Sequence, residues 1–179
     1  MRLLHYSHSI IEKIVDRKPL DEDPRNFCTG MKPFGFWVSV EGDYDWEWWC
    51  NAENFRTENL QYVYGVTIKE NASILHLRTC EEILEFTKEY LVKEEDLTFI
   101  KETYGYKALK MTNLLDSYNI NWVRVGSKYN GIIISPYQWD LRLSTETSWY
   151  YGWDCASGCI WNTDVIEKVT LVKGPLEEV

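Results

Sequence analysis

Apolar and aromatic residues occur in short runs along the first part of the chain, at lengths typical of β-strands. The run Leu3–Ser7 is apolar and aromatic, and the run Gly35–Val40 is rich in aromatic and β-branched residues. Two further runs, Tyr62–Ile68 and Ser73–Leu77, flank Asn71, a residue type that favours turns. We therefore expect this part of the chain to be built mainly of strands.

Other segments show the spacing of an α-helix. From Asp43 to Cys50, acids precede tryptophans and a cysteine that can share one helix face, and acids suit the positive end of a helix. The segment Cys80–Tyr90 alternates apolar and charged residues with a helical period, which predicts an amphipathic helix. A second helical stretch is expected near Tyr106–Ser117.

The last third of the chain returns to strand-like patterns. Between the first two predicted strands, residues 16–33 form a proline-rich, charged segment, which predicts a long surface loop able to close over a site. Strands at both ends with helices between them predict an α+β fold whose first and last segments share one sheet system. The C-terminal strands are expected at Gly131–Ser135, Trp149–Trp153, Gly158–Trp161 and Val165–Val172.

Composition and the lack of certain segments predict the number of domains and the cellular location. The 179 residues are 45% hydrophobic and 26% charged, and no glycine- or serine-rich linker interrupts them. We therefore expect a single domain over residues 1–179. The sequence shows neither an apolar stretch near the roughly 20 residues that span a bilayer nor a secretory signal pattern, so we expect a cytoplasmic protein without a membrane partner.

Net charge and cysteine content bear on three features: nucleic-acid binding, disulfide bonds and metal sites. A net charge of −9 disfavours nonspecific binding to nucleic acid, which leaves a nucleic-acid substrate as a minority interpretation. The five cysteines are scattered and odd in number, which favours reduced, buried thiols over a disulfide framework. No metal site is expected, because Cys155 and Cys159 lack a second pair at zinc-ligand spacing.

Candidate binding residues lie on the first strands. Alternation along a strand places His5 and Ser7 on one face, where an imidazole and a hydroxyl can bind a ribose or an amide, or simply form a structural pair. Trp37 and Ser39 share a face of the second strand, and Trp37 is either a wall for a planar ring or a core residue. Gly35 allows a backbone or a ligand to approach closely.

Candidate acids and a cation lie near the C-terminal aromatic segment. Asp154 is bracketed by large rings, so it is either a desolvated functional carboxylate or a turn residue that bonds the backbone of Ser157. Glu146 is a second candidate acid in a polar stretch. Arg142 offers paired donors that can clamp a phosphate, although a surface role is the alternative. No Walker loop, GxSxG, HExxH or GxGxxG pattern is present.

The histidine on the first strand, the stretch Gly35–Ser39 on the second and the aromatic C-terminus together resemble the ADP-ribosyltransferase superfamily. The stretches 32–39 and 153–161 also look like segments of small proteins from phage and bacterial genomes. The resemblance implies a split antiparallel β-sheet core with helices inserted between the N-terminal and C-terminal strands. It also implies NAD as a substrate, with His5 holding its ribose.

The same resemblance implies roles for the other candidates. Trp37 and Ser39 would line the nicotinamide pocket, Tyr137 would stack, and a late acid, Asp154 or Glu146, would stabilise the ribosyl cation. We therefore expect an NAD-dependent ADP-ribosyltransferase with a protein or nucleic acid as acceptor. A noncatalytic binder of a nucleotide or sugar is the alternative, and a protein-interaction domain with tryptophans in its core and interface is a third hypothesis.

Overall fold

The computed structural model describes residues 1–14, 32–42, 44–105 and 119–174. Most of the expected surface loop, Asp43, Cys28 and the helix expected near 106–117 lie outside these described residues. Among the described residues, no helix is long and apolar enough to cross a membrane.

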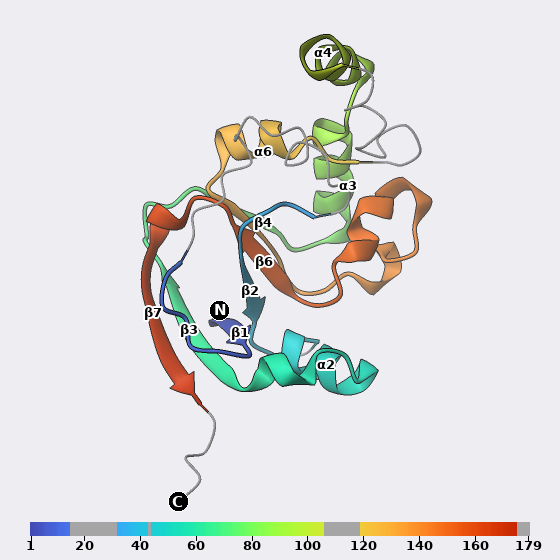
Figure 1. The fold of residues 1–179 in the computed structure, drawn as a ribbon. Coiled ribbons are helices and arrows are strands. Elements are labelled where there is room, and N and C mark those ends of the chain that lie inside the picture. Colours follow the sequence, from blue (N-terminus) through green and yellow to red (C-terminus); the bar gives the residue numbers. More distant parts are fainter. Residues whose placement is uncertain (15–31, 43, 106–118, 175–179) are drawn as a thin grey trace, which may run out of the picture.

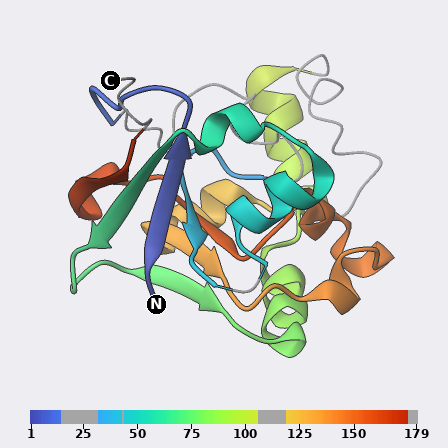
Figure 2. The same ribbon diagram turned by 90° about the horizontal axis from the view of Figure 1, so that it is seen from below.

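The described strands form one seven-stranded sheet in the order β4-β5-β6-β2-β1-β3-β7 (Figure 1). Neighbouring strands are antiparallel except for the parallel pair β4 and β5. β1 lies between β2 and β3 (Figure 2), and these two strands pair with the C-terminal strands β6 and β7. The first and last segments of the chain therefore share one sheet, as predicted. The strands are β1 (Leu3–Ser7), β2 (Phe36–Val40), β3 (Tyr62–Ile68), β4 (Ile74–Leu77), β5 (Gly131–Ile134), β6 (Ser157–Ile160) and β7 (Ile166–Lys173).

The helices begin at well-formed caps. The Asp45 side chain accepts a hydrogen bond from the backbone N–H of Trp48, and Thr79 forms a capping box with Glu82. The helices predicted after Asp45 and over Cys80–Tyr90 are confirmed, whereas α4 and α6 were not predicted. The helices are α2 (Trp46–Glu53), α3 (Cys80–Tyr90), α4 (Glu94–Tyr104) and α6 (Trp122–Lys128), with 3-10 helices η1 (Thr57–Leu60), η2 (Trp139–Leu141), η3 (Thr145–Gly152) and η4 (Thr163–Val165).

The strand predicted over Trp149–Trp153 is wrong, because this segment lies mainly in the 3-10 helix η3. Trp149, Tyr150 and Trp153 are buried while Tyr151 is 52% exposed. This burial follows a helical turn and not the alternation of a strand. Burial of the large rings thus outweighs the preference of aromatic residues for strands.

The main core lies between the sheet and the helices α3 and α6, which lie on the same side of it (Figure 1). Trp122, Trp149, Trp153 and Trp161 are all buried in this cluster. Full burial of such rings contributes about 4–6 kcal/mol each to stability on an area basis. Most of the C-terminal aromatic segment therefore serves the core.

Glycine allows strands to approach closely around β6. A Cβ atom at Gly35 would lie 2.6 Å from Cys159 Sγ and 2.7 Å from the carbonyl oxygen of Ile160. The close approach expected at Gly35 is therefore that of the β6 backbone and not that of a ligand. Gly158 on β6 has the same role, since its Cβ would lie 2.6 Å from the carbonyl oxygen of Ile132.

The sheet opens between β1 and β2. Their register joins Leu3 to Val40 and Leu4 to Ser39, whereas β1 goes on to pair with β3 through Ser7. On the other side, β2 pairs with β6 over its length from Ser39 to Phe36. The two strands therefore diverge after Leu4, and this opening positions the candidate site.

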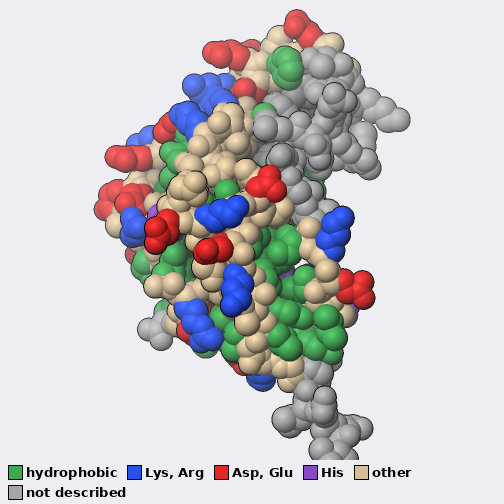
Figure 3. All heavy atoms as spheres, turned by 90° about the vertical axis from the view of Figure 1, so that its left-hand side faces the viewer, with side chains coloured by type: hydrophobic (Ala, Val, Ile, Leu, Met, Phe, Trp, Pro, Cys, Tyr) green, Lys and Arg blue, Asp and Glu red, His purple; other side chains and the backbone are tan. Residues whose placement is uncertain are grey.

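The edge strand β7 carries many charges. Glu167, Lys168 and Lys173 are exposed on it, and Lys173 Nζ lies 3.9 Å from Glu47 Oε1. The side of the molecule on which β7 lies shows acidic and basic side chains intermixed with a hydrophobic area (Figure 3). Charged side chains on an edge strand discourage pairing with another chain.

Candidate functional site

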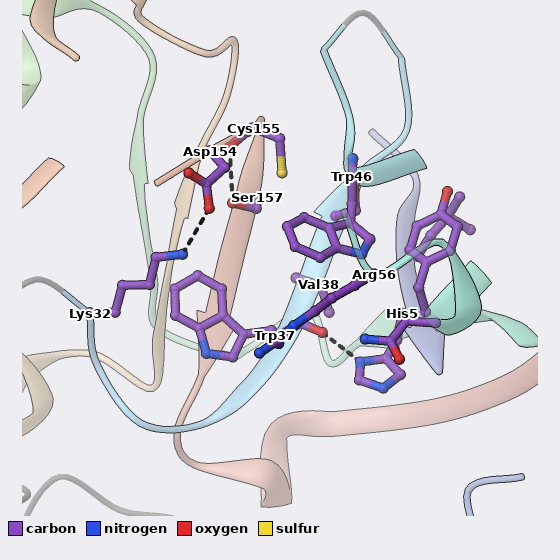
Figure 4. Close-up of a pocket in the computed structure, with 13 residues that line it drawn as sticks. His5, Lys32, Trp37, Val38, Trp46, Arg56, Asp154, Cys155 and Ser157 are labelled. Atoms are coloured by element: carbon purple, nitrogen blue, oxygen red, sulfur yellow. Dashed lines mark hydrogen bonds and ion pairs between the residues drawn. The ribbon is translucent and has the colours of Figure 1, made fainter. Parts of the chain in front are cut away.

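A pocket of about 300 Å³ lies where β1 and β2 diverge (Figure 4). Its walls come from β1, Lys32 and β2, the start of α2, Arg56 and Asn59 at η1, and the residues just before and at the start of β6. His5, Trp37, Ser39 and Asp154, which sequence reasoning singled out, all line it. Ligand pockets commonly measure about 300–1,000 Å³, so this one suits a nucleoside-sized group.

His5 occupies the opening between the strands. Its Nδ1 lies 2.7 Å from the carbonyl oxygen of Trp37, and its ring stacks on Phe36 with centroids 4.2 Å apart at 17°. A carbonyl only accepts, so Nδ1 carries the hydrogen, and Nε2 is the acceptor of the neutral ring. Burial lowers the pKa of His5 below 6.5, partly offset by the bond to Trp37. His5 is therefore a neutral acceptor at pH 7.

Trp37 forms an aromatic wall of the pocket. Its ring meets the buried ring of Trp153 edge-on, with centroids 5.0 Å apart and an interplanar angle of 61°. The Lys32 ammonium lies 5.2 Å from the centroid of Trp37. Trp37 is half-buried, so its ring has both a packed side and a side toward the pocket.

Asp154 is the acid of the pocket and lies just before β6. Its Oδ2 is 3.4 Å from Lys32 Nζ and its Oδ1 is 3.9 Å from Arg142 Nη2. The side chain is 25% exposed. Arg142 lies with its guanidinium 4.5 Å from the centroid of Trp49, and its side chain is 18% exposed. The carboxylate thus bonds to side-chain cations, and not to the backbone of Ser157 as its alternative role required.

The hydroxyl of Ser39 is already used in the fold. Ser39 is buried, and its Oγ accepts a hydrogen bond of 2.9 Å from the backbone N–H of Trp46 at the start of α2. The Ser39 hydroxyl hydrogen can still donate to a ligand. Ser39 therefore links the wall of the pocket to the beginning of α2.

Several polar groups of the pocket were not found from sequence, namely Tyr6, Lys32, Arg56 and Asn59. Arg56 lines it from the turn before η1, where its φ of 49° is left-handed. Tyr6 also lines it, and among the described residues its buried hydroxyl has no hydrogen-bond partner. Burial raises the pKa of Tyr6, with a smaller contribution from Asp45 and other acids. The αL turn at Asn54 and Arg56 has no clear sequence signature apart from the asparagine itself.

Cys155 lines the pocket but cannot act as its nucleophile at neutral pH. Burial raises the pKa of the Cys155 thiol to about 12, and burial raises that of Cys159 well above its usual value. Cys50, Cys155 and Cys159 are buried, as predicted for small apolar side chains, whereas Cys80 is only half-buried. Within the described residues, no group of three or more His, Cys, Asp or Glu side chains is arranged to hold a metal ion.

The remaining candidates lie outside the pocket lining. Ser7 lines a wider neighbouring cavity of about 830 Å³, which shares His5 with the pocket. Tyr137 is buried, and its hydroxyl donates to the carbonyl oxygen of Trp153. Glu146 is exposed on η3 and does not line the pocket. Arg142 reaches the site only through its contact with Asp154.

These features define an α+β protein with a pocket at the opening of a mostly antiparallel sheet, lined by an imidazole, an indole and a carboxylate. No protein-family model matches the sequence, and neither a curated protein nor a solved structure matches it significantly. The function must therefore be inferred from the chemistry of the site.

Proposed function

We propose that the chain binds NAD in this pocket and transfers its ADP-ribose group to an acceptor. The observation that carries the proposal is the position of His5, Trp37 and Asp154 around one pocket, although they are far apart in the sequence. The resemblance to ADP-ribosyltransferases assigns these positions to ribose, nicotinamide and the ribosyl cation. Their convergence supports that assignment.

The residues fit the parts of NAD. The Trp37 ring offers a face to the nicotinamide, and the Nε2 of a neutral His5 can accept from a ribose hydroxyl. Arg56 supplies positive charge for the pyrophosphate. The pocket of about 300 Å³ suits one nucleoside, and His5 also lines a wider neighbouring cavity.

Asp154 would act on the charge that develops during the reaction. The bond between ribose C1′ and the nicotinamide nitrogen breaks with its electron pair going to that nitrogen. The acceptor's nucleophile bonds to C1′ and releases its proton to solvent. A carboxylate beside C1′ stabilises the developing positive charge more in the transition state than in bound NAD. Half-buried surroundings strengthen this interaction relative to water.

A noncatalytic nucleotide binder is the second candidate, and the contacts of Asp154 favour it. Lys32 and Arg142 both lie within 4 Å of this carboxylate, so its charge is compensated in the resting protein. A compensated acid stabilises a ribosyl cation less, while the cations still attract phosphate. In this case, calorimetry would detect NAD binding without release of nicotinamide.

Release of nicotinamide from NAD tests the first candidate. We expect Asp154→Asn to slow it by roughly 10²–10³-fold, the usual effect of removing one electrostatic group from a reaction site. Glu146→Gln, which alters an exposed acid outside the pocket, should leave the rate unchanged. His5→Ala should abolish the release of nicotinamide. Equal rates for the unmodified chain and for the Asp154 and His5 variants would remove the site assignment.

The acceptor is tested in the same assay with NAD labelled in its adenylate group. We expect a protein acceptor to take up the label more readily than nucleic acid, because the net charge of −9 opposes a polyanion. Label in added DNA or RNA but not in protein would contradict this expectation.

A further inference from the structure

Lys32 places its ammonium between an aromatic face and a carboxylate. The Nζ atom lies 5.2 Å from the centroid of Trp37 and 3.4 Å from Asp154 Oδ2. Figure 4 shows the side chain reaching from one wall of the pocket toward both groups. Aromatic faces attract organic cations, and a nearby carboxylate adds Coulomb attraction to the same cation.

We propose that Trp37 and Asp154 form a subsite for a flat organic cation, and that Lys32 occupies it until such a ligand displaces the ammonium. The proposal deepens the proposed function, because the oxidised nicotinamide ring of NAD is a flat cation. It also specifies a ligand class that can be tested without any transfer reaction: aromatic ring cations of the pyridinium type.

The contacts of Lys32 are those of an exchangeable group. Its side chain is 39% exposed, its distance of 3.4 Å to Asp154 is long for a charge-assisted hydrogen bond, and 5.2 Å is near the outer limit for a cation over a ring. Exposed ion pairs of this kind contribute little to stability. Lys32 can therefore leave the subsite without a large loss of folding free energy.

Arg142 stays near Asp154 after Lys32 leaves, with its Nη2 atom 3.9 Å from Asp154 Oδ1. Its guanidinium lies 4.5 Å from the centroid of Trp49 and 5.7 Å from that of Trp139, and its side chain is less exposed than that of Lys32. Packing against rings holds Arg142 in place, so only one of the two cations is exchangeable. The carboxylate can therefore exchange the ammonium for a ligand cation.

Lys32 has opposite effects under the two possible roles. If it competes with the ligand cation, its removal strengthens binding of that cation. If it instead acts as a direct ligand contact, its removal weakens binding. The sign of the change in affinity therefore separates displacement from direct contact.

Calorimetry with 1-methylnicotinamide, a pyridinium cation, and with neutral nicotinamide provides the test. We expect the unmodified chain to bind the cation more tightly, and Lys32→Met to bind it about tenfold more tightly still, as expected for loss of a competing cation–π and ion-pair contact. Neutral nicotinamide should change by less than about twofold. Lys32→Arg keeps the competing charge and should resemble the unmodified chain. Lys168→Met, an exposed lysine on β7, is the matched control.

Several results would overturn the proposal. Weaker or unchanged binding of the cation by Lys32→Met would exclude displacement, and an equal gain for both probes would show that only space was freed. A preference of the unmodified chain for neutral nicotinamide would exclude the cation subsite without any variant. If 1-methylnicotinamide binds as expected but NAD is never cleaved, the transfer function fails and the subsite stands.

Discussion

The Nδ1 atom of His5 lies 2.7 Å from the carbonyl oxygen of Trp37, at the point where β1 and β2 stop pairing. The side chain of one strand thus provides a partner for a backbone group of the other where the sheet opens. This contact explains how the strands can diverge and form a pocket without leaving that carbonyl unpaired.

Replacing His5 should destabilise the fold as well as the site. His5→Ala leaves the Trp37 carbonyl without its partner and removes the stack on Phe36, so we expect a loss of about 1–3 kcal/mol in the free energy of unfolding. Urea unfolding followed by circular dichroism measures it. His8→Ala, which alters a nearby exposed histidine, should change stability by less than about 0.5 kcal/mol. A similar value for both variants would refute the structural role of His5.

Stability should fall as the solution becomes acidic. The pKa values of His5 and His76 are lowered in the folded protein, mainly by burial, from 6.5 in the unfolded chain. Below pH 6.5 the unfolded chain takes up protons that the folded protein does not. The free energy of unfolding therefore falls as the pH falls below 6.5. Unfolding free energies measured from pH 7.5 down to pH 5 should show this loss, and the double variant His5→Gln, His76→Gln should reduce it. An unchanged slope in that variant would assign the loss to other groups.

Glycine at position 158 should be indispensable for joining β5 to β6. In Gly158→Ala the new Cβ would lie 2.6 Å from the carbonyl oxygen of Ile132 and 2.7 Å from Ile133 Cγ1. We expect a loss of about 2–3 kcal/mol or more, since backbone must shift. Gly65→Ala on β3 is the matched control, because the nearest atom lies 3.4 Å from its Cβ. Thermal unfolding of both variants compares them, and an equal change in melting temperature would contradict the packing argument.

Trp149 and Thr87 should be energetically coupled. The indole Nε1–H of Trp149 donates to Thr87 Oγ1 over 2.8 Å in a buried contact between η3 and α3. Thr87→Val leaves that donor without its partner and should cost about 1–3 kcal/mol. Thr98→Val is the control, since Thr98 bonds only to its own helix, at the carbonyl of Glu94, and is exposed.

A double-mutant cycle with Trp149→Phe measures the coupling directly. We expect an interaction energy of about 0.5–1.5 kcal/mol for the pair, within the range for residues that share a hydrogen bond. Additive effects of the two substitutions would show that Trp149 stabilises the protein through packing alone.

Much of the secondary structure could be predicted from local pattern. The strands Leu3–Ser7 and Tyr62–Ile68 and the helix Cys80–Tyr90 have the predicted bounds. The helix has a clear amphipathic period and a capping residue at its start, and the strands are rich in apolar and aromatic residues. The failures have physical causes as well. The composition of Trp149–Trp153 predicts a strand, but its rings are buried with the spacing of a helical turn. The helix Trp122–Lys128 is short and was not predicted.

The sequence by itself determined which residue types were available for the site: a histidine and a tryptophan on neighbouring strands and an acid among aromatic rings. Only the tertiary structure decided which of them meet, because the pocket depends on where β1 and β2 diverge and on β6 pairing with β2. It placed Asp154 in the pocket and Glu146 on an exposed helix. The tertiary structure also places Arg56 in the pocket lining and Lys32 within 3.4 Å of Asp154. These residues are far apart in the sequence, so no local pattern predicts that they lie together.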